Sequence, residues 1–248
     1  MSEADQAQHR RFIILGLPRS GTTYLMTLLN SHRDVTCSGE LFNPYSVIET
    51  GEPDYDPDLR YKRDWGPRYF MRQFFERHEA EPWQQIGFKL MLGHNIRVLS
   101  QLPDLAQTRI IYIHRENRLA QVASYLKAMQ TKNWAQTRRS RDMARKIVAS
   151  PEEISHQWHE YATMDFLFAQ WLGSLPNPSL TLEYCELFRP EFNARICAFL
   201  GLQHDSGMKS PLIKQGSNRV LDRFATPDPI ESYMRYLGRA NWLEDELV

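Results

Sequence analysis

The 248-residue sequence has few cysteines, no excess of one charge and no long hydrophobic run. Its three cysteines, Cys37, Cys185 and Cys197, show no C-x-x-C spacing. Such a sparse and odd-numbered set argues against a disulfide framework and a cysteine-rich zinc site, and favours a reducing compartment. The polar stretch 1–10 precedes an apolar run that is far too short for a signal peptide or a membrane span. The sequence therefore predicts a cytoplasmic protein without an integral membrane segment.

The charges balance, because 30 Lys and Arg residues face 30 Asp and Glu residues. Without a global excess of positive charge, the sequence gives no sign of nucleic acid or an anionic membrane as a partner. Any anion site must therefore be local. A hydrophobic content of 42% in a chain of this length is enough for one large core. We expect a single domain over residues 1–248, with a flexible tail over 1–10.

Short β-like runs alternate with longer helical segments, which predicts a three-layer α/β/α fold with a central parallel sheet. The expected strands cover 12–15, 86–91, 109–114 and 179–182, and the expected helices 22–31, 119–129 and 191–200. Residues 43–65 are rich in Pro, Asp and Tyr, which indicates an irregular excursion that helps to shape a binding site. The stretch 132–146 is strongly basic. We interpret it as a solvated helix face, with a lid or site-lining role as the alternative.

The first expected strand runs into a glycine loop and then a helix, which is the geometry of an anion cradle. Gly16 and Gly21 allow the backbone to curl so that successive N–H groups face inward, and the helix N-terminus adds partial positive charge. Arg19 adds a full charge, and Thr22 and Thr23 add hydroxyl donors. The loop is predicted to hold a phosphate or a sulfate in a P-loop-like manner.

The glycine spacing nearly fits the nucleoside-triphosphate P-loop G-x-x-x-x-G-K-[ST], but Thr22 stands where the lysine belongs. A P-loop enzyme also needs an acidic residue at a neighbouring strand end to hold Mg²⁺. The strand 110–113 is followed by His114 and Arg115 instead. This favours a nucleotide bound by side chains without a metal. A kinase or nucleotide hydrolase that uses ATP and Mg²⁺, and a non-catalytic anion-binding protein, remain as alternatives.

Residues 18–25 resemble the 5′-phosphosulfate-binding loop of the sulfotransferases that use 3′-phosphoadenosine 5′-phosphosulfate (PAPS), in the Arg-Ser-Gly-Thr-Thr form of carbohydrate sulfotransferases. Residues 114–124 resemble that family's 3′-phosphate-binding segment. The nine-residue step from Arg115 to Ser124 is similar to that of bacterial trehalose and nodulation-factor sulfotransferases. Arg115 follows a strand, where open α/β sheets bind ligands, and Ser124 can face it from the next helix. Residues 214–219 resemble, more weakly, the segment that closes over the 3′-phosphate.

The resemblance implies PAPS as sulfonate donor, adenosine 3′,5′-bisphosphate as product, and no metal. It implies a carbohydrate or small-molecule hydroxyl as acceptor, and a homodimer as a candidate oligomeric state. The residues that it implies for donor binding are Pro18, Arg19, Ser20, Gly21, Thr22, Thr23, Tyr24, Arg115, Ser124, Lys214, Asn218 and Arg219. The aromatic side chains of the insert, which spans residues 43–70, could stack on sugar rings, with the hydrophobic core as the alternative location. They are Tyr45, Tyr55, Tyr61, Trp65, Tyr69 and Phe70.

Sulfonate transfer requires neutralisation of the leaving phosphate and a base for the incoming hydroxyl. Arg19 and the loop N–H groups, assisted by Lys89, are expected to stabilise the leaving charge. The resemblance implies Glu40 as the base, because bacterial carbohydrate sulfotransferases carry a glutamate at the matching point. We expect partial burial to raise the pKa of Glu40 towards the working pH. His32 and His94 are the alternative bases, and a surface position for Glu40 stays open.

Overall fold

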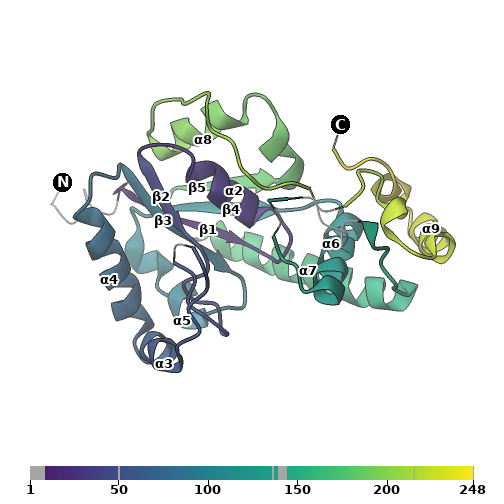
Figure 1. Cartoon of the computed structure of the whole chain (residues 1–248), viewed down its shortest axis with the longest axis horizontal. Helices are drawn as coiled ribbons and strands as arrows, with labels where there is room; N and C mark the ends of the chain where they lie inside the picture. Colours follow the sequence, from purple (N-terminus) through teal and green to yellow (C-terminus); the bar gives the residue numbers. More distant parts are fainter. Residues whose placement is uncertain (1–8, 50, 136, 139–143, 215, 248) are drawn as a thin grey trace.

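A computed structural model describes residues 9–49, 51–135, 137–138, 144–214 and 216–247, and in this part of the chain five strands form one parallel sheet (Figure 1). The order across the sheet is β2-β3-β1-β4-β5, and each neighbouring pair is parallel. The strands are β1 (Arg11–Gly16), β2 (Val35–Ser38), β3 (Gln85–Met91), β4 (Arg109–His114) and β5 (Ser179–Glu183). The α/β class with a central parallel sheet is therefore confirmed.

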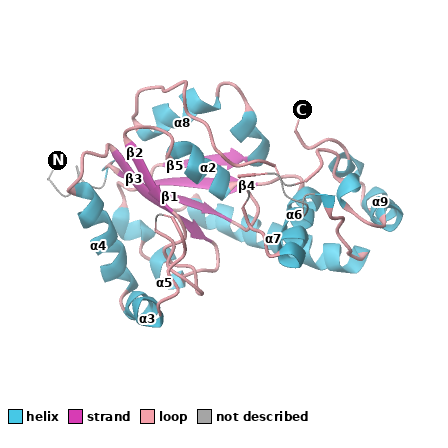
Figure 2. Ribbon diagram, viewed as in Figure 1, coloured by secondary structure: helices cyan, strands magenta, loops and turns pink. Residues whose placement is uncertain are grey.

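Strand β1 is buried on both faces, which explains why it is continuously apolar in sequence. Phe12 and Ile14 belong to one hydrophobic cluster, whereas Ile13 and Leu15 belong to the other. Helices α2 (Thr22–Leu29) and α8 (Phe192–Leu200) cover the first face. Helices α4 (Pro67–Glu79), α6 (Arg118–Thr131) and α7 (Pro151–Leu172) cover the second. Figure 2 shows the resulting three layers.

Local caps fix where the helices beside the site begin. The Asn117 side chain accepts a hydrogen bond from the Ala120 N–H at 2.9 Å, so α6 starts at Arg118. Ser150 and Glu153 form a capping box before α7. Of the helices that the sequence predicted, α6 is longer than 119–129 at both ends, and α2 and α8 lie within the expected 22–31 and 191–200.

The expectation of an irregular excursion over 43–65 is wrong for its second half. Residues 57–65 form helix α3 (Pro57–Trp65), because the Asp56 side chain caps the Asp58 N–H and Pro57 suits the first helical turn. The described residues from 43 to 56 form no helix, and Val47 and Asp54 make one isolated antiparallel bridge. The insert is therefore a bridged loop that leads into a helix.

The interpretation of 132–146 as a helix face is also wrong where the structure describes it. Helix α6 ends at Thr131, and Lys132 follows with a left-handed φ of 57°. Residues 132–135, 137–138 and 144–146 form no α-helix. Position 136 and positions 139–143, which include Arg139 and Arg141, lie outside the described residues. Trp134 and Ala135 line a pocket beside the glycine loop, so two residues of this stretch have the alternative, site-lining role.

Two further α-helices and four 3₁₀ helices complete the described elements. They are α5 (Ile96–Leu99), α9 (Pro227–Tyr236) and the short 3₁₀ helices η1 (Leu102–Leu105), η3 (Tyr184–Phe188), η4 (Leu221–Arg223) and η5 (Ala240–Leu243). Of the expected tail 1–10, residues 1–8 lie outside the described ranges, and the Arg10 guanidinium donates to the Trp83 carbonyl at 3.1 Å. None of the helices in the described ranges is long and apolar enough to cross a bilayer.

Candidate anion-binding and transfer site

The sheet topology places the site at the carboxyl ends of β1, β3 and β4. From β1 the chain turns through α2 to β2 on one side, and after β3 it crosses to β4 on the other side of β1. The loops after β1 and β4 therefore diverge between these two neighbouring strands. Ligands bind at such a topological switch point in open α/β sheets. The glycine loop and Arg115 meet there, as the sequence predicted.

The loop after β1 has the geometry of an anion cradle. A Cβ atom on Gly16 would lie 2.8 Å from the Ile113 carbonyl oxygen and 2.6 Å from Ser20 Oγ, so only glycine fits. Arg19 and Gly21 have left-handed φ angles of 65° and 105°. Helix α2 begins with neither a side-chain cap nor an acidic first turn. Ser20 Oγ is buried and has no hydrogen-bond partner among the described residues. These features fit a phosphate or sulfate group.

Lys89 and Glu40 form a buried ion pair beside this cradle. Lys89 Nζ lies 2.7 Å from Glu40 Oε1 and donates to Thr23 Oγ1 at 2.7 Å. Asn43 Nδ2 donates to Glu40 Oε2 at 2.7 Å, and His94 Nε2 lies 3.8 Å from the same oxygen. The structure thus brings the expected base next to the expected charge-neutralising lysine.

The expected rise in the pKa of Glu40 is wrong. Burial raises the pKa of Glu40, but the ammonium and hydrogen bond of Lys89, the Asn43 amide and His94 lower it more, so it lies below the ordinary value. Burial also lowers the pKa of His94, although Glu40 opposes this effect. At neutral pH Glu40 is therefore an ionised carboxylate and His94 a neutral imidazole.

His32 lies elsewhere in the fold. It precedes β2 and so lies at the amino-terminal ends of the parallel strands, whereas the site lies at their carboxyl ends. Its Nδ1 accepts from the Asp34 N–H at 3.1 Å, and its Nε2 contacts the Gln203 carbonyl oxygen at 3.0 Å. Both ring nitrogens are engaged in holding loops together. Of the two histidines that the sequence offered as alternative bases, His94 is the one that lies beside Glu40.

A cationic pocket adjoins the cradle. Arg115 is buried, and its Nη1 donates to the Arg19 carbonyl at 2.9 Å while its guanidinium lies 4.1 Å from the Tyr184 ring centroid. Arg19 Nε donates to Ser124 Oγ at 2.9 Å, which links the loop to helix α6. Burial and the neighbouring Arg115 lower the pKa of Arg19 to about 10, so Arg19 is a cation at neutral pH. The pocket is lined mainly by Arg19, Gly21, Thr22, Thr23, Tyr24, Arg115, Ser124, Lys127, Trp134, Tyr184, Phe188, Lys214 and Arg223.

Four of the residues that the resemblance implied do not line this pocket: Pro18, Ser20, Asn218 and Arg219. Ser20 lies within the cradle, and the Pro18 carbonyl accepts from Gln121 Nε2 at 2.9 Å. Asn218 binds the backbone of Leu247 through both atoms of its amide. Arg219 is exposed. Its backbone forms an isolated bridge with Asp245.

Sequence reasoning missed several residues of the pocket. Arg223 and Lys127 add positive charge to its wall, Tyr184 and Phe188 add aromatic surface, and Glu246 contacts the cations. Lys127 follows Ser124 by three residues on α6, so helical periodicity could have found it. Arg223 and Glu246 belong to no motif, and only the folded chain brings them to Arg115.

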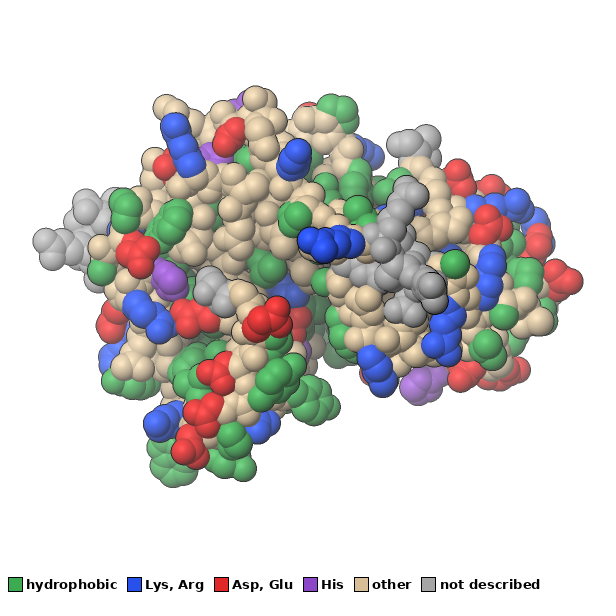
Figure 3. All heavy atoms as spheres, in the orientation of Figure 1, with side chains coloured by type: hydrophobic (Ala, Val, Ile, Leu, Met, Phe, Trp, Pro, Cys, Tyr) green, Lys and Arg blue, Asp and Glu red, His purple; other side chains and the backbone are tan. Residues whose placement is uncertain are grey.

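The aromatic insert residues are mostly on the surface. Tyr45, Tyr55, Tyr61, Trp65 and Tyr69 are more than half exposed, whereas Phe70 packs on the core against Phe42. Figure 3 shows apolar surface around α3, and a hollow between this side and the side that carries α6 and α9. The core location that we considered for these aromatics therefore holds for Phe70 alone.

Fold and site together define an α/β protein in which arginine and lysine side chains surround a glycine-loop anion cradle. A sequence model of the Sulfotransferase family matches residues 11–206, and the chain therefore belongs to this family. The match favours a sulfotransferase over the kinase or hydrolase alternative.

Two relatives and one solved structure show the extent of similarity. Nodulation protein H of Rhizobium meliloti (strain 1021) is 31% identical over 126 residues, which are 50% of this chain and 49% of that protein. Nodulation protein H of Rhizobium tropici is 29% identical over 116 residues, which are 39% of this chain and 47% of that protein. The chain thus spans about half the length of these curated relatives. A crystal structure of a sulfotransferase from Alicyclobacillus acidocaldarius aligns with 94% of this chain and 93% of its own, with a TM-score of 0.48 and 18% identity.

Proposed function

We propose that this protein is a sulfotransferase that moves a sulfonate group from PAPS to a hydroxyl of a carbohydrate or small-molecule acceptor. The observation that carries the proposal is the Lys89 ammonium, which bridges Glu40 and Thr23 at the start of α2. A base and an anion cradle are thereby joined by one cation. In-line transfer needs these three groups together. Family membership supports the same reaction class.

The two ends of PAPS, the nucleotide that carries the sulfonate, would bind to different parts of the site. We assign the 5′-phosphosulfate to residues 18–24, where Ser20 Oγ and the loop N–H groups can donate. We assign the 3′-phosphate to Arg115, Ser124 and Lys214, which line the adjoining pocket. When bound, PAPS supplies the sulfonate and leaves as adenosine 3′,5′-bisphosphate. Arg219 in this role stays a prediction from the resemblance.

We assign to Glu40 the role of accepting the proton of the incoming hydroxyl, which its ionised state allows although the lowered pKa makes it a weaker base. It is ionised at neutral pH and its carboxylate is held by Lys89 and Asn43, so it can only accept hydrogen bonds. Lys89 and Arg19 can neutralise charge that develops on the leaving phosphate. The sulfonate transfer and the proton removal are then served by separate groups.

We propose that the acceptor approaches from the side of the insert. A second cleft includes Pro44, Asp64 and His94, and His94 lies beside Glu40. The exposed rings of Tyr45 and Trp65 belong to the same part of the chain, and flat apolar rings can stack on sugars. A carbohydrate is therefore the acceptor class that these surfaces favour. The free thiols of Cys37, Cys185 and Cys197 support a reducing, cytoplasmic compartment.

The test compares nucleotides and then turnover. Adenosine 3′,5′-bisphosphate should raise the melting temperature more than ATP does with or without Mg²⁺, because stabilisation follows preferential binding to the native state. A coupled assay with PAPS and a panel of sugars and other hydroxyl compounds should then show transfer. Magnesium-dependent consumption of ATP, with no response to the bisphosphate, would contradict the proposal.

A further inference from the structure

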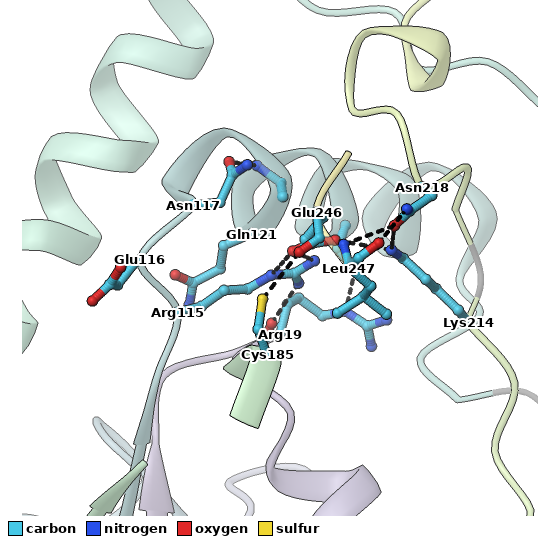
Figure 4. A network of polar contacts seen from close by, with 12 residues as sticks. Arg19, Arg115, Glu116, Asn117, Gln121, Cys185, Lys214, Asn218, Glu246 and Leu247 are labelled. Carbon is cyan, nitrogen blue, oxygen red and sulfur yellow. Dashed lines mark hydrogen bonds and ion pairs between the residues drawn. The ribbon is translucent and has the colours of Figure 1, made fainter. Parts of the chain in front are cut away.

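One carboxylate holds three cations of the pocket. The Glu246 side chain is 1% exposed and contacts Arg115 and Lys214 (Figure 4). It also contacts Arg223. Its Oε1 accepts from Arg115 Nε at 2.5 Å, and its Oε2 lies 2.8 Å from Arg223 Nη2 and 3.3 Å from Lys214 Nζ. The three cations line the pocket, whereas Glu246 is absent from the described lining. Glu246 therefore lies behind the cationic wall.

The guanidinium groups of Arg115 and Arg223 also donate to backbone carbonyls on the sides that face away from Glu246. Arg115 Nη1 donates to Arg19 at 2.9 Å. Arg223 Nε and Nη1 donate to Ser217 at 2.8 Å and to Ala120 at 3.3 Å. Each guanidinium is thus held between the main chain and Glu246. Three cations against one carboxylate leave an excess of positive charge, which suits the dianion of a phosphate monoester.

The segment that carries Glu246 is anchored to the loop that carries Lys214. Asn218 donates to the Leu247 carbonyl at 2.6 Å and accepts from the Leu247 N–H at 2.9 Å. The Glu246 N–H donates to the Asn218 carbonyl at 3.2 Å, and Cys185 Sγ lies 3.1 Å from the Glu246 carbonyl oxygen. These contacts bring residues from three separate parts of the chain to one place.

We infer that Glu246 is a positioning residue for the 3′-phosphate subsite, and that it sets the preference for nucleotides with a 3′-phosphate by holding Arg115, Lys214 and Arg223 toward the pocket. This inference rests on the proposed function. Side chains that bind a ligand do so best when a further layer of contacts fixes their rotamers. A carboxylate that instead occupied the subsite would compete with the nucleotide, and its removal would tighten binding.

Glu246 also favours the charged form of Lys214. Burial lowers the pKa of Lys214, and Arg223 and Arg115 lower it further, whereas Glu246 raises it. These are the charged groups that face Lys214 from η4, from the end of β4 and from the segment 245–247. Without the carboxylate, Lys214 would lose its proton at a lower pH. As the pH rises, recognition of the 3′-phosphate would then start to weaken at a lower pH than in the wild-type protein.

The experiment measures the affinities of adenosine 3′,5′-bisphosphate and adenosine 5′-monophosphate by calorimetry. In Glu246→Gln we expect the bisphosphate to bind about tenfold more weakly, on the scale known for outer-shell partners of metal ligands, and the monophosphate to change less than about twofold. Any loss of bisphosphate affinity on the alkaline side, where Lys214 gives up its proton, should shift to lower pH in this variant. Glu246→Asp, which keeps the charge, should recover part of the loss.

Controls separate the inference from the proposed function. Glu244→Gln makes the same chemical change at an exposed neighbour and should leave both affinities unchanged. If loss of the buried charge prevents folding, Asn218→Ala removes the amide that holds both the Leu247 backbone and Lys214, without changing charge, and should give the same selective loss. Unchanged or tighter bisphosphate binding in the folded variant overturns the inference. Failure of the wild-type protein to prefer the bisphosphate overturns the proposed function itself.

Discussion

The Nζ atom of Lys89 lies 2.7 Å from the Oε1 atom of Glu40, and both side chains are largely buried. The pair connects two functions of the site, since Lys89 also donates to Thr23 in the first turn of α2. A buried pair of this kind resists the loss of either partner, because the remaining charge would be uncompensated. The lysine therefore fixes both the position and the ionisation of the proposed base.

Replacing Glu40 by glutamine should reduce kcat by about a hundredfold or more, because the amide cannot take the proton of the hydroxyl. The binding of adenosine 3′,5′-bisphosphate should be retained, since Glu40 does not line the nucleotide pocket. Steady-state kinetics and calorimetry measure the two quantities. Glu52→Gln, at an exposed position of the insert, is the matched control. Unaltered turnover would move the role to His94.

Replacing Lys89 by methionine should lower kcat by about two to three powers of ten, because a cation near the leaving phosphate is lost. It should also change the pH profile. In the wild-type protein Lys89 is the main opponent of the burial effect that raises the pKa of Glu40. Without it, the pKa of Glu40 rises above its wild-type position, and kcat falls at a higher pH on the acid side. The profile of kcat at saturating PAPS checks this shift.

The control for this variant is Lys209→Met, at an exposed position, which should leave the profile unchanged. An acid limb of Lys89→Met that coincides with that of the wild-type protein would show that Glu40 does not govern it. The direction of the shift follows from linkage: a base works when ionised, so a raised pKa removes its activity at a higher pH.

Replacing Arg115 by alanine should weaken the binding of adenosine 3′,5′-bisphosphate by at least about tenfold, since a hydrogen bond to a charged group contributes about 1.5–3 kcal/mol. The affinity for adenosine 5′-monophosphate should fall much less. Arg33→Ala removes an exposed arginine and serves as the control. Calorimetry that found equal losses for both nucleotides would assign Arg115 a general structural role instead.

The fold and the cradle were predictable because their signals are local. The apolar run of β1, the glycines at 16 and 21 and the arginine after β4 all lie next to the elements that they serve. Helix α3 was missed because its polar sequence resembles a loop, although Asp56 and Pro57 form a start signal.

The environment of the site was not predictable in the same way. The lowered pKa of Glu40 depends on Lys89, which is 49 positions further along the chain and reaches it only through the pairing of β2 with β3. The contact of Glu246 with Arg115 joins residues 131 positions apart. Neither partner carries a sequence pattern that indicates the other, so tertiary structure alone reveals them.

Gly16→Ala should abolish bisphosphate binding and destabilise the fold by about 1–3 kcal/mol, because the added methyl group would collide with the Ile113 carbonyl and with Ser20. Denaturant unfolding and calorimetry measure the two effects. Gly173→Ala is the control, since its nearest contact would be 3.6 Å and its φ of −64° suits alanine. A folded Gly16→Ala protein with normal affinity would contradict the cradle geometry.

A chain of polar contacts connects the core to the glycine loop, and its central residue is Asp165 on α7. Asp165 contacts the Tyr112 hydroxyl on β4 and the Arg118 guanidinium on α6. Arg118 Nη1 in turn donates to Gln121 Oε1 at 2.9 Å, and the Gln121 amide donates to the carbonyl of Pro18. Asp165→Asn would keep the shape of the side chain but remove the counter-ion of a largely buried arginine.

We expect Asp165→Asn to lower the free energy of unfolding by about 2–4 kcal/mol, because Arg118 would be left partly uncompensated. Loosening of Gln121 should also weaken adenosine 3′,5′-bisphosphate binding, although Asp165 itself does not line the pocket. Urea denaturation gives the first quantity and calorimetry below the unfolding transition gives the second. Glu160→Gln, on the exposed side of the same helix, should change neither. A destabilised Asp165→Asn protein with unchanged nucleotide affinity would show that the contacts support the fold without positioning the loop.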